Sequence, residues 1–177
     1  GTASGDSIVI DGGSGNYTVT NSYVDGLAGN DTIEVDVRIG SSTLDAGAGN
    51  DNVTIGGAVV TSSIVGGAGD DTLAIGRPAV SVLSSTLDAG AGSDSISAVH
   101  FTSSSITLGE GNDTLFFGSG ATLGSLVSST VTASAGYNWI SANANITSSS
   151  LTAAASGDTI LIGGNVSAGT VTGGAGT

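Results

Sequence analysis

Several kinds of residue are missing or scarce in this sequence of 177 residues, and each absence narrows the possible functions. There is no cysteine, which excludes disulfide bonds and thiol chemistry. There is no lysine, and Arg38 and Arg77 are the only arginines against fifteen acidic residues, so the formal net charge is −13. Such a charge opposes binding to nucleic acid or to anionic membranes and favours cations as partners. No apolar run approaches the roughly 20 residues that cross a bilayer, so we expect no membrane insertion.

Aromatic residues are also few, with one tryptophan, three tyrosines and three phenylalanines. The core must therefore be built from Val, Ile, Leu and Ala, which suits thin stacked layers. His100 is the only histidine, so neither a zinc site nor a serine-type catalytic triad can be assembled around it. The acidic residues recur in similar loops instead of gathering in one differentiated cleft. We therefore expect no enzyme activity and no catalytic residues.

One glycine-rich pattern recurs along the chain at intervals close to 20 residues. The clearest copy, residues 65–75, reads VGGAGDDTLAI and contains a glycine-dense turn, an acidic residue and a short alternating segment. A serine lies nine residues before the last aspartate of each copy, whereas insertions, at 77–78 and 118–124, follow the alternating segment as surface loops would. A period of this size indicates a repeat protein. The last aspartates are Asp31, Asp51, Asp71, Asp94, Asp113 and Asp158, and Asn138 takes their place in one copy.

Each repeat contains two short strand signals and no helical period. One strand follows the aspartate, as in residues 32–37, and the other leads from the serine into the loop, as in residues 42–44. A unit of about 20 residues cannot bury its own apolar face, but parallel stacking ~4.8 Å apart buries it in ladders of Leu and Ile. We therefore predict an all-β fold, a parallel β-solenoid of about eight coils with the loops along one edge. Residues 1–177 would form a single solenoid segment of a longer array, irregular over 1–21 and regular over 22–177.

The loop that begins at Gly66 reads GGAGDDTLA and fits the nonapeptide G-G-x-G-x-D-x-U-x, in which U is a large apolar residue. Over most of residues 22–177 the chain resembles the RTX, or haemolysin-type, calcium-binding repeat family. It departs from the usual pattern because it has one loop per coil instead of two. In this it is similar to variants found in large bacterial surface and adhesion proteins, including cyanobacterial ones. The resemblance implies that calcium lines one edge of the solenoid, between successive loops.

The chemistry of the loop supports a calcium site independently. Glycines at alternate positions can adopt positive φ and turn backbone carbonyls toward a common centre. Calcium takes six to eight oxygen ligands, which two stacked loops can supply and a single loop cannot. We expect four strong sites, one between each pair of neighbouring aspartates from Asp31 to Asp113, and hence about four or more calcium ions. Sites that touch Asn138 should be weak or empty because an amide brings no charge.

The predicted metal ligands fall into two groups. The carboxylate ligands are Asp31, Asp51, Asp71, Asp94, Asp113 and Asp158, with Asp6 as a marginal member. The backbone carbonyl ligands are Ala46, Gly47, Ala48, Gly49, Gly66, Gly67, Ala68, Gly69, Ala89, Gly90, Ala91 and Gly92.

The expected function is structural. We interpret the chain as a calcium-stabilised module of a secreted or cell-surface protein, such as an S-layer, an extracellular matrix fibre or an adhesin stalk. Exposed strand edges favour self-association into fibres or arrays.

The alternative is a ligand-binding module for ice or glycans. Hydroxyl columns such as Thr43, Ser63 and Thr86 could order water, although that face is mostly serine. Tyr137 and Trp139, in the degraded copy, are interpreted as packing that replaces a lost ion and not as a sugar platform.

Overall fold

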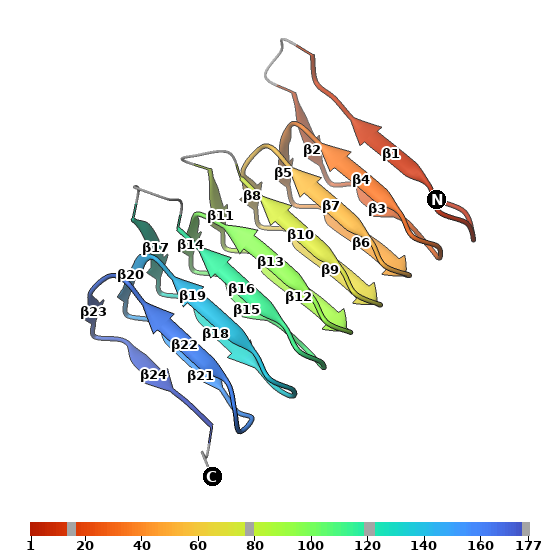
Figure 1. Ribbon diagram of the computed structural model, residues 1–177. Coiled ribbons are helices and arrows are strands. Elements are labelled where there is room, and N and C mark those ends of the chain that lie inside the picture. The colour runs from red at the N-terminus through yellow and green to blue at the C-terminus, as the bar shows by residue number, and fades with distance from the viewer. Residues whose placement is uncertain (14–16, 77–79, 119–122, 175–177) are drawn as a thin grey trace.

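The computed structural model describes residues 1–13, 17–76, 80–118 and 123–174, and these residues form a parallel β-solenoid without a helix (Figure 1). Each turn of the chain contributes one strand to each of three parallel sheets, and eight strands stack in each sheet. Seven turns therefore separate the first strand of a sheet from the last, and the predicted all-β solenoid is confirmed. The described residues contain no helix that could cross a membrane.

The three sheets are named here A, B and C. Sheet A consists of β1 (Ser7–Ile10), β4 (Thr32–Val35), β7 (Asn52–Ile55), β10 (Thr72–Ile75), β13 (Ser95–Ala98), β16 (Thr114–Phe117), β19 (Trp139–Ala142) and β22 (Thr159–Ile162). Sheet B consists of β2 (Thr18–Thr20), β5 (Arg38–Gly40), β8 (Val59–Val60), β11 (Ser81–Leu83), β14 (His100–Thr102), β17 (Gly124–Val127), β20 (Ala144–Thr147) and β23 (Val166–Ser167). Sheet C consists of β3 (Tyr23–Asp25), β6 (Thr43–Ala48), β9 (Ser63–Ala68), β12 (Thr86–Ala91), β15 (Ser105–Thr107), β18 (Thr130–Ala133), β21 (Ser150–Ala153) and β24 (Thr170–Thr172).

Sheets A and C contain the two strands that the sequence predicts for each repeat, whereas sheet B is an addition. Its strands lie in the stretch interpreted as a variable connection, and several are too short for a two-residue alternation to be recognised, such as Val59–Val60. The expected insertions fall between sheets A and B. Residues 77–78 and most of 118–124 lie outside the described residues.

The core is a set of apolar ladders that run along the solenoid axis. In sheet A, Ile33 pairs in register with Val53, and in sheet C Leu44 pairs with Ile64, all of them buried. Alternation along each strand places these side chains inside and their polar neighbours outside. One aromatic pair lies inside as well, because the rings of Phe101 and Phe117 meet edge to face with centroids 6.0 Å apart.

A buried serine explains why the serine keeps a constant distance from the loop. The residue before it has left-handed backbone, as in Ser84 with φ of 49°, and this residue turns the chain from sheet B into sheet C. Ser85 Oγ donates to the Leu83 carbonyl at 2.7 Å and accepts the N–H of Ser62 at 3.1 Å. The bond between coils requires the serine at the same place in every turn. The same N–H···Oγ bond joins Ser22 to Ser42, Ser42 to Ser62, Ser85 to Ser104, Ser104 to Ser129 and Ser129 to Ser149.

Candidate metal centre

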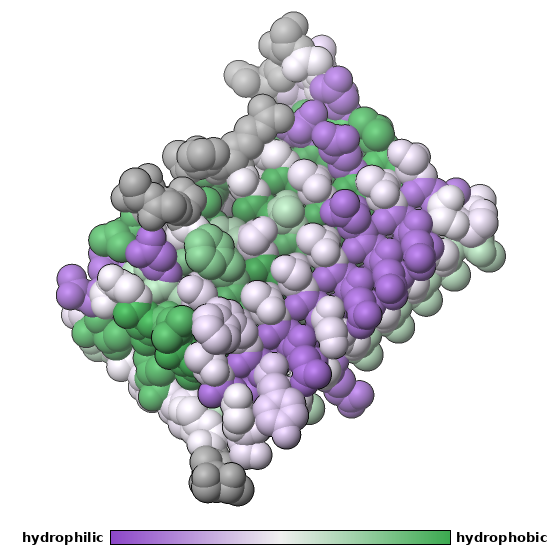
Figure 2. Space-filling model, in the orientation of Figure 1, coloured by the Kyte–Doolittle hydropathy of each residue, from purple (hydrophilic) through white to green (hydrophobic). Residues whose placement is uncertain are grey.

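The glycine-aspartate loops stack along the edge where sheet C passes into sheet A, at the lower right in Figure 1. Figure 2 shows hydrophilic residues gathered along this edge. The loop glycines have positive φ, 108° at Gly47 and 134° at Gly49. They also allow close stacking, since a Cβ on Gly67 would clash with the Gly47 carbonyl oxygen. Glycine is therefore required here for its conformation and for its lack of a side chain.

The buried aspartates form a hydrogen-bonded ladder through one carboxylate oxygen each. Asp71 Oδ1 accepts the N–H of Asp51 at 2.8 Å, and the N–H of Asp71 donates to Asp94 Oδ1 at 2.8 Å. The bond always runs from one coil to the next, so each aspartate holds its predecessor in register. The other steps join Asp6 to Asp31, Asp31 to Asp51, Asp94 to Asp113, Asp113 to Asn138 and Asn138 to Asp158.

The second carboxylate oxygen has no such partner. Oδ2 of Asp71 is buried and has no hydrogen-bond partner among the described residues. A Cβ on Gly66 would lie 2.7 Å from this oxygen and would clash with the carbonyl oxygen of Ala89 in the next coil. Oxygens from two coils thus border the same small space, and Gly26 has the same arrangement with Asp31 Oδ2 and the Ala46 carbonyl. The unpartnered Oδ2 atoms are those of Asp31, Asp51, Asp71, Asp94, Asp113 and Asp158.

Buried acceptors without donors are rare and unfavourable, and a repeated set of them favours a cation as their partner. In the described part of the chain, no three His, Cys, Asp or Glu side chains come together. A bound metal would therefore take most of its ligands from backbone carbonyls, with one carboxylate from each loop. An oxygen-only donor set of this kind suits calcium, a hard cation that accepts carbonyl and carboxylate oxygens. The residues present fit that ion.

Burial raises the pKa of four of these carboxyl groups. It raises the pKa of Asp71 to about 7 and that of Asp113 to about 6, and it also raises the pKa values of Asp51 and Asp94. The backbone N–H donor of the preceding coil opposes the shift, and neighbouring carboxylates add to it. At these four carboxylates the folded loop therefore favours a proton or a cation over the free anion.

The structure brings together most of the predicted ligands. Asp31, Asp51, Asp71, Asp94 and Asp113 form one continuous ladder, with Asp6 before it and Asp158 after Asn138. Among the predicted backbone ligands, the carbonyls of Ala46 and Ala89 border the Oδ2 atoms. Those of Ala48, Ala68 and Ala91 accept the N–H groups of Gly29, Gly49 and Gly69, each at 2.7 Å.

A further ladder on the loop surface was missed in the sequence. The residue just before the buried aspartate links the loops in the opposite direction. The N–H of Asn50 donates to Asn30 Oδ1 at 2.9 Å, and that of Asp70 donates to Asn50 Oδ1 at 3.0 Å. Ser93 and Tyr137 donate in the same way to Asp70 and Asn112. The sequence signal for this surface ladder was the Asn or Asp residue that often lies directly before the buried aspartate.

Four segments of the chain match the sequence model of the RTX calcium-binding nonapeptide repeat: residues 21–36, 38–57, 62–74 and 103–122. Each segment contains one stacked loop, with Asp31, Asp51, Asp71 and Asp113 respectively. Comparisons with curated proteins and with solved structures found no match. The chain therefore carries RTX calcium-binding repeats, and the resemblance drawn from the loop motif is confirmed.

Proposed function

We propose that this RTX-repeat solenoid is a calcium-stiffened structural module of a secreted or cell-surface protein, such as an S-layer, an extracellular matrix fibre or an adhesin stalk. One observation carries the proposal: among the described residues, a buried Oδ2 atom without a hydrogen-bond partner recurs in almost every coil. At Gly26 and Gly66, which have no side chain, this oxygen lies beside a carbonyl oxygen of the next coil. A cation between successive loops would join neighbouring coils along the whole edge.

The charge balance supports several ions. The four strong sites are proposed to lie between successive aspartates from Asp31 to Asp113. Four divalent ions bound there would offset eight of the thirteen net negative charges. Because like charges repel in the compact state, this neutralisation stabilises the solenoid in addition to the coordination bonds. The proposed carbonyl ligands remain those of residues 46–49, 66–69 and 89–92, and Asp158 and Asp6 are proposed as the outer members of the carboxylate set.

An extracellular location follows from the affinity expected of such sites. Extracellular calcium modules bind with dissociation constants of about 10⁻⁴ to 10⁻³ M, so they fill outside the cell and stay empty in the cytosol. Binding that requires the folded loop contributes its free energy to folding. Self-association into fibres or arrays belongs to the same proposal, because parallel strands with loops in register can add further coils of the same kind.

The direct test is isothermal titration calorimetry of the chelated and dialysed protein with calcium, and with magnesium as the control. We expect about four calcium ions per chain with dissociation constants near the millimolar range, and much weaker magnesium binding because magnesium requires a rigid octahedral site. Absence of calcium binding at millimolar concentration would contradict the proposed function.

One observation favours ice binding as a second candidate. On the outer face of sheet C, Thr107, Thr132, Thr152 and Thr172 are consecutive register partners and form the C-terminal half of a column, whose N-terminal half consists of Asp25, Asp45, Val65 and Asp88. The strands are ~4.8 Å apart, so hydroxyl and methyl groups repeat regularly on a flat face. The hydroxyl column predicted from the sequence, which includes Thr43 and Ser63, lies beside it and is mixed with serine.

This candidate predicts thermal hysteresis in the presence of calcium. Replacement of Thr132 by tyrosine should abolish it, because a bulky ring interrupts the flat column at its centre. The matched control is Thr114→Tyr, on the outer face of sheet A. Lack of hysteresis in the calcium-loaded wild-type chain would exclude ice binding.

A further inference from the structure

We propose that the coil of Asn138 needs no metal, and that its side-chain amide replaces the ion and keeps neighbouring coils stacked when calcium is absent. The inference rests on the proposed function, since it concerns the one interior coil in which the calcium-binding aspartate is missing. It makes this coil the metal-free folding nucleus of the array.

Asn138 occupies the place of an aspartate in the ladder. Its Oδ1 accepts the N–H of Asp113 at 3.0 Å, and its own N–H donates to Asp158 Oδ1 at 2.8 Å. The side chain is only 2 % exposed, like the buried aspartates. Because Oδ1 makes the same bond as in the other coils, the Nδ2 group takes the place of the second carboxylate oxygen.

At that place Asn138 has a hydrogen-bond donor, whereas the aspartates have an acceptor. Nδ2 of Asn138 donates to the Ala135 carbonyl at 3.0 Å and to Asp158 Oδ1 at 3.1 Å. In the coil of Asp71 the corresponding atom is an oxygen with no donor. The amide therefore gives hydrogen bonds to one loop carbonyl and to one oxygen of the neighbouring carboxylate, which is the task left to a cation elsewhere along the edge.

The backbone of this part of the edge also differs from the metal-type loops. Strands β6, β9 and β12 continue into their loops, whereas β18 and β21 end at Ala133 and Ala153; β15, before the loop of Asp113, is short as well, so the difference that is particular to these two loops lies in their glycines. Ser134 and Ala154 replace the first positive-φ glycine.

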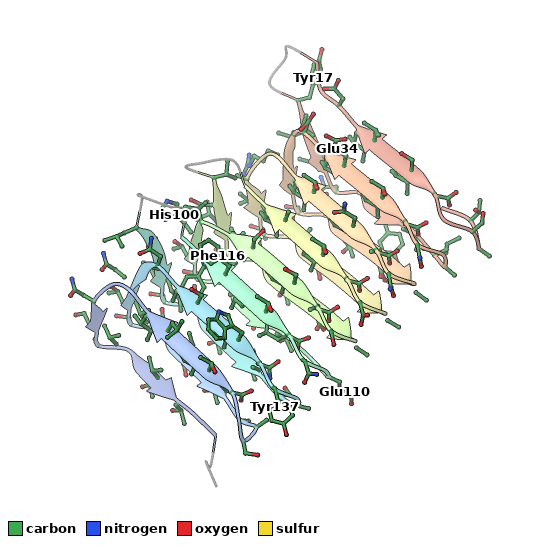
Figure 3. The ribbon with its side chains drawn as sticks, in the orientation of Figure 1. Tyr17, Glu34, His100, Glu110, Phe116 and Tyr137 are labelled. Carbon is green, nitrogen blue, oxygen red and sulfur yellow. The ribbon has the colours of Figure 1, made fainter. Side chains whose placement is uncertain are left out.

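A side chain covers the loop of the following coil. A Cβ on Gly157 would lie 2.5 Å from Cδ1 of Tyr137, so the tyrosine ring packs directly over that glycine (Figure 3 labels Tyr137 on the loop edge). The loop of Asn138 is therefore closed by hydrogen bonds and packing, whereas Oδ2 of Asp158 in the following loop stays buried without a hydrogen-bond partner among the described residues.

A coil that is complete without metal has a consequence for folding. In a solenoid each coil is stabilised mainly by its neighbours, so order can begin at any coil that is stable and extend from there. At low calcium, β18, β19 and β21 should remain stacked around Asn138 while the aspartate coils open. Calcium binding would then extend the ordered stack from this nucleus toward β6.

Hydrogen–deuterium exchange of the chelated full chain, together with calcium titration calorimetry, tests the inference. In wild type we expect slower exchange in residues 130–153 than in residues 43–91. Asn138→Asp should accelerate exchange in 130–153 by roughly tenfold or more in chelator, because it replaces hydrogen bonds to a carbonyl and a carboxylate with charge repulsion. With calcium present the same variant should fold, because calcium offsets the added charge, but it should bind no additional ion, since Ser134 stands where the metal-type loops have their first positive-φ glycine.

Asn112→Asp is the matched control. It adds the same charge one loop away, at a position where Asp70 occurs in another coil, and it keeps the acceptor for the Tyr137 N–H. It should change neither the ion count nor the exchange of residues 130–153. If wild type binds calcium but the two variants behave alike, or if exchange in chelator is uniform along the chain, the inference is wrong. If wild type binds no calcium, the proposed function fails and the inference fails with it.

Discussion

Asp71→Ala should be among the most destabilising single substitutions in the calcium-loaded protein. Removing Oδ1 leaves the buried N–H of Asp51 without an acceptor, which costs about 1–3 kcal/mol. Removing Oδ2 deletes the carboxylate ligand of the proposed calcium site beside the Ala89 carbonyl. Each site lost costs about 2.7 kcal/mol when calcium is at 100 times its dissociation constant. Thermal unfolding followed by circular dichroism, together with the calcium stoichiometry, measures both parts.

Asp71→Asn separates the two roles of this side chain. The amide keeps an oxygen for the Asp51 N–H and places a donor where Oδ2 has no partner, as Asn138 does naturally. We therefore expect the variant to be less stable than wild type in calcium and more stable than wild type in chelator. Asp70→Asn is the control, because Asp70 is exposed and keeps its bond from Ser93, so its effect should be small in both conditions. Equal destabilisation of Asp71→Asn in both conditions would mean that the loops act only as turns.

Removal of calcium at neutral pH should unfold most of the array, and acid should restore it without metal. A carboxyl whose pKa is raised by folding stabilises the fold fully below its unfolded value and loses that contribution as pH rises through the folded value. For Asp71 and Asp113 the ordinary pKa is 3.8 and the pKa values in the folded state are about 7 and about 6, so the metal-free fold weakens between about pH 4 and about pH 7. Acidification also reduces the repulsion that accompanies a net charge of −13.

Circular dichroism of the chelated protein checks this. At about pH 8 the β signal should fall to the part contributed by the coils around Asn138, and at about pH 5 it should recover. In millimolar calcium the signal should be independent of pH over the same range, and magnesium should not replace calcium. An unchanged β spectrum in chelator at about pH 8 would show that the apolar ladders fold alone and that the ions are dispensable.

The sequence by itself determined the parts of this protein that depend on local spacing. The repeat of about 20 residues, the alternation in Ile33 and Val35, and the distance from serine to aspartate are visible along the chain. They are sufficient for the solenoid, sheets A and C, and the edge that carries the aspartates, because the strand pleat fixes which side chains face inward. The loop glycines could be predicted for the same reason, since positive φ is a local requirement.

The tertiary structure alone decided what happens between coils. Sheet B escaped prediction because strands of two to four residues, such as β8 and β14, gain their stability from stacking and not from a pattern of their own. The bonds of Ser85 and Asp71 join residues 19 to 23 positions apart, and only stacking places the donor of one coil at the acceptor of the next. Stacking also leaves Oδ2 of Asp71 without a hydrogen-bond partner, in contrast to Oδ1, and it brings the partners of the Asn138 amide within reach. These roles depend on how neighbouring coils stack, which the spacing of residues within one repeat does not specify.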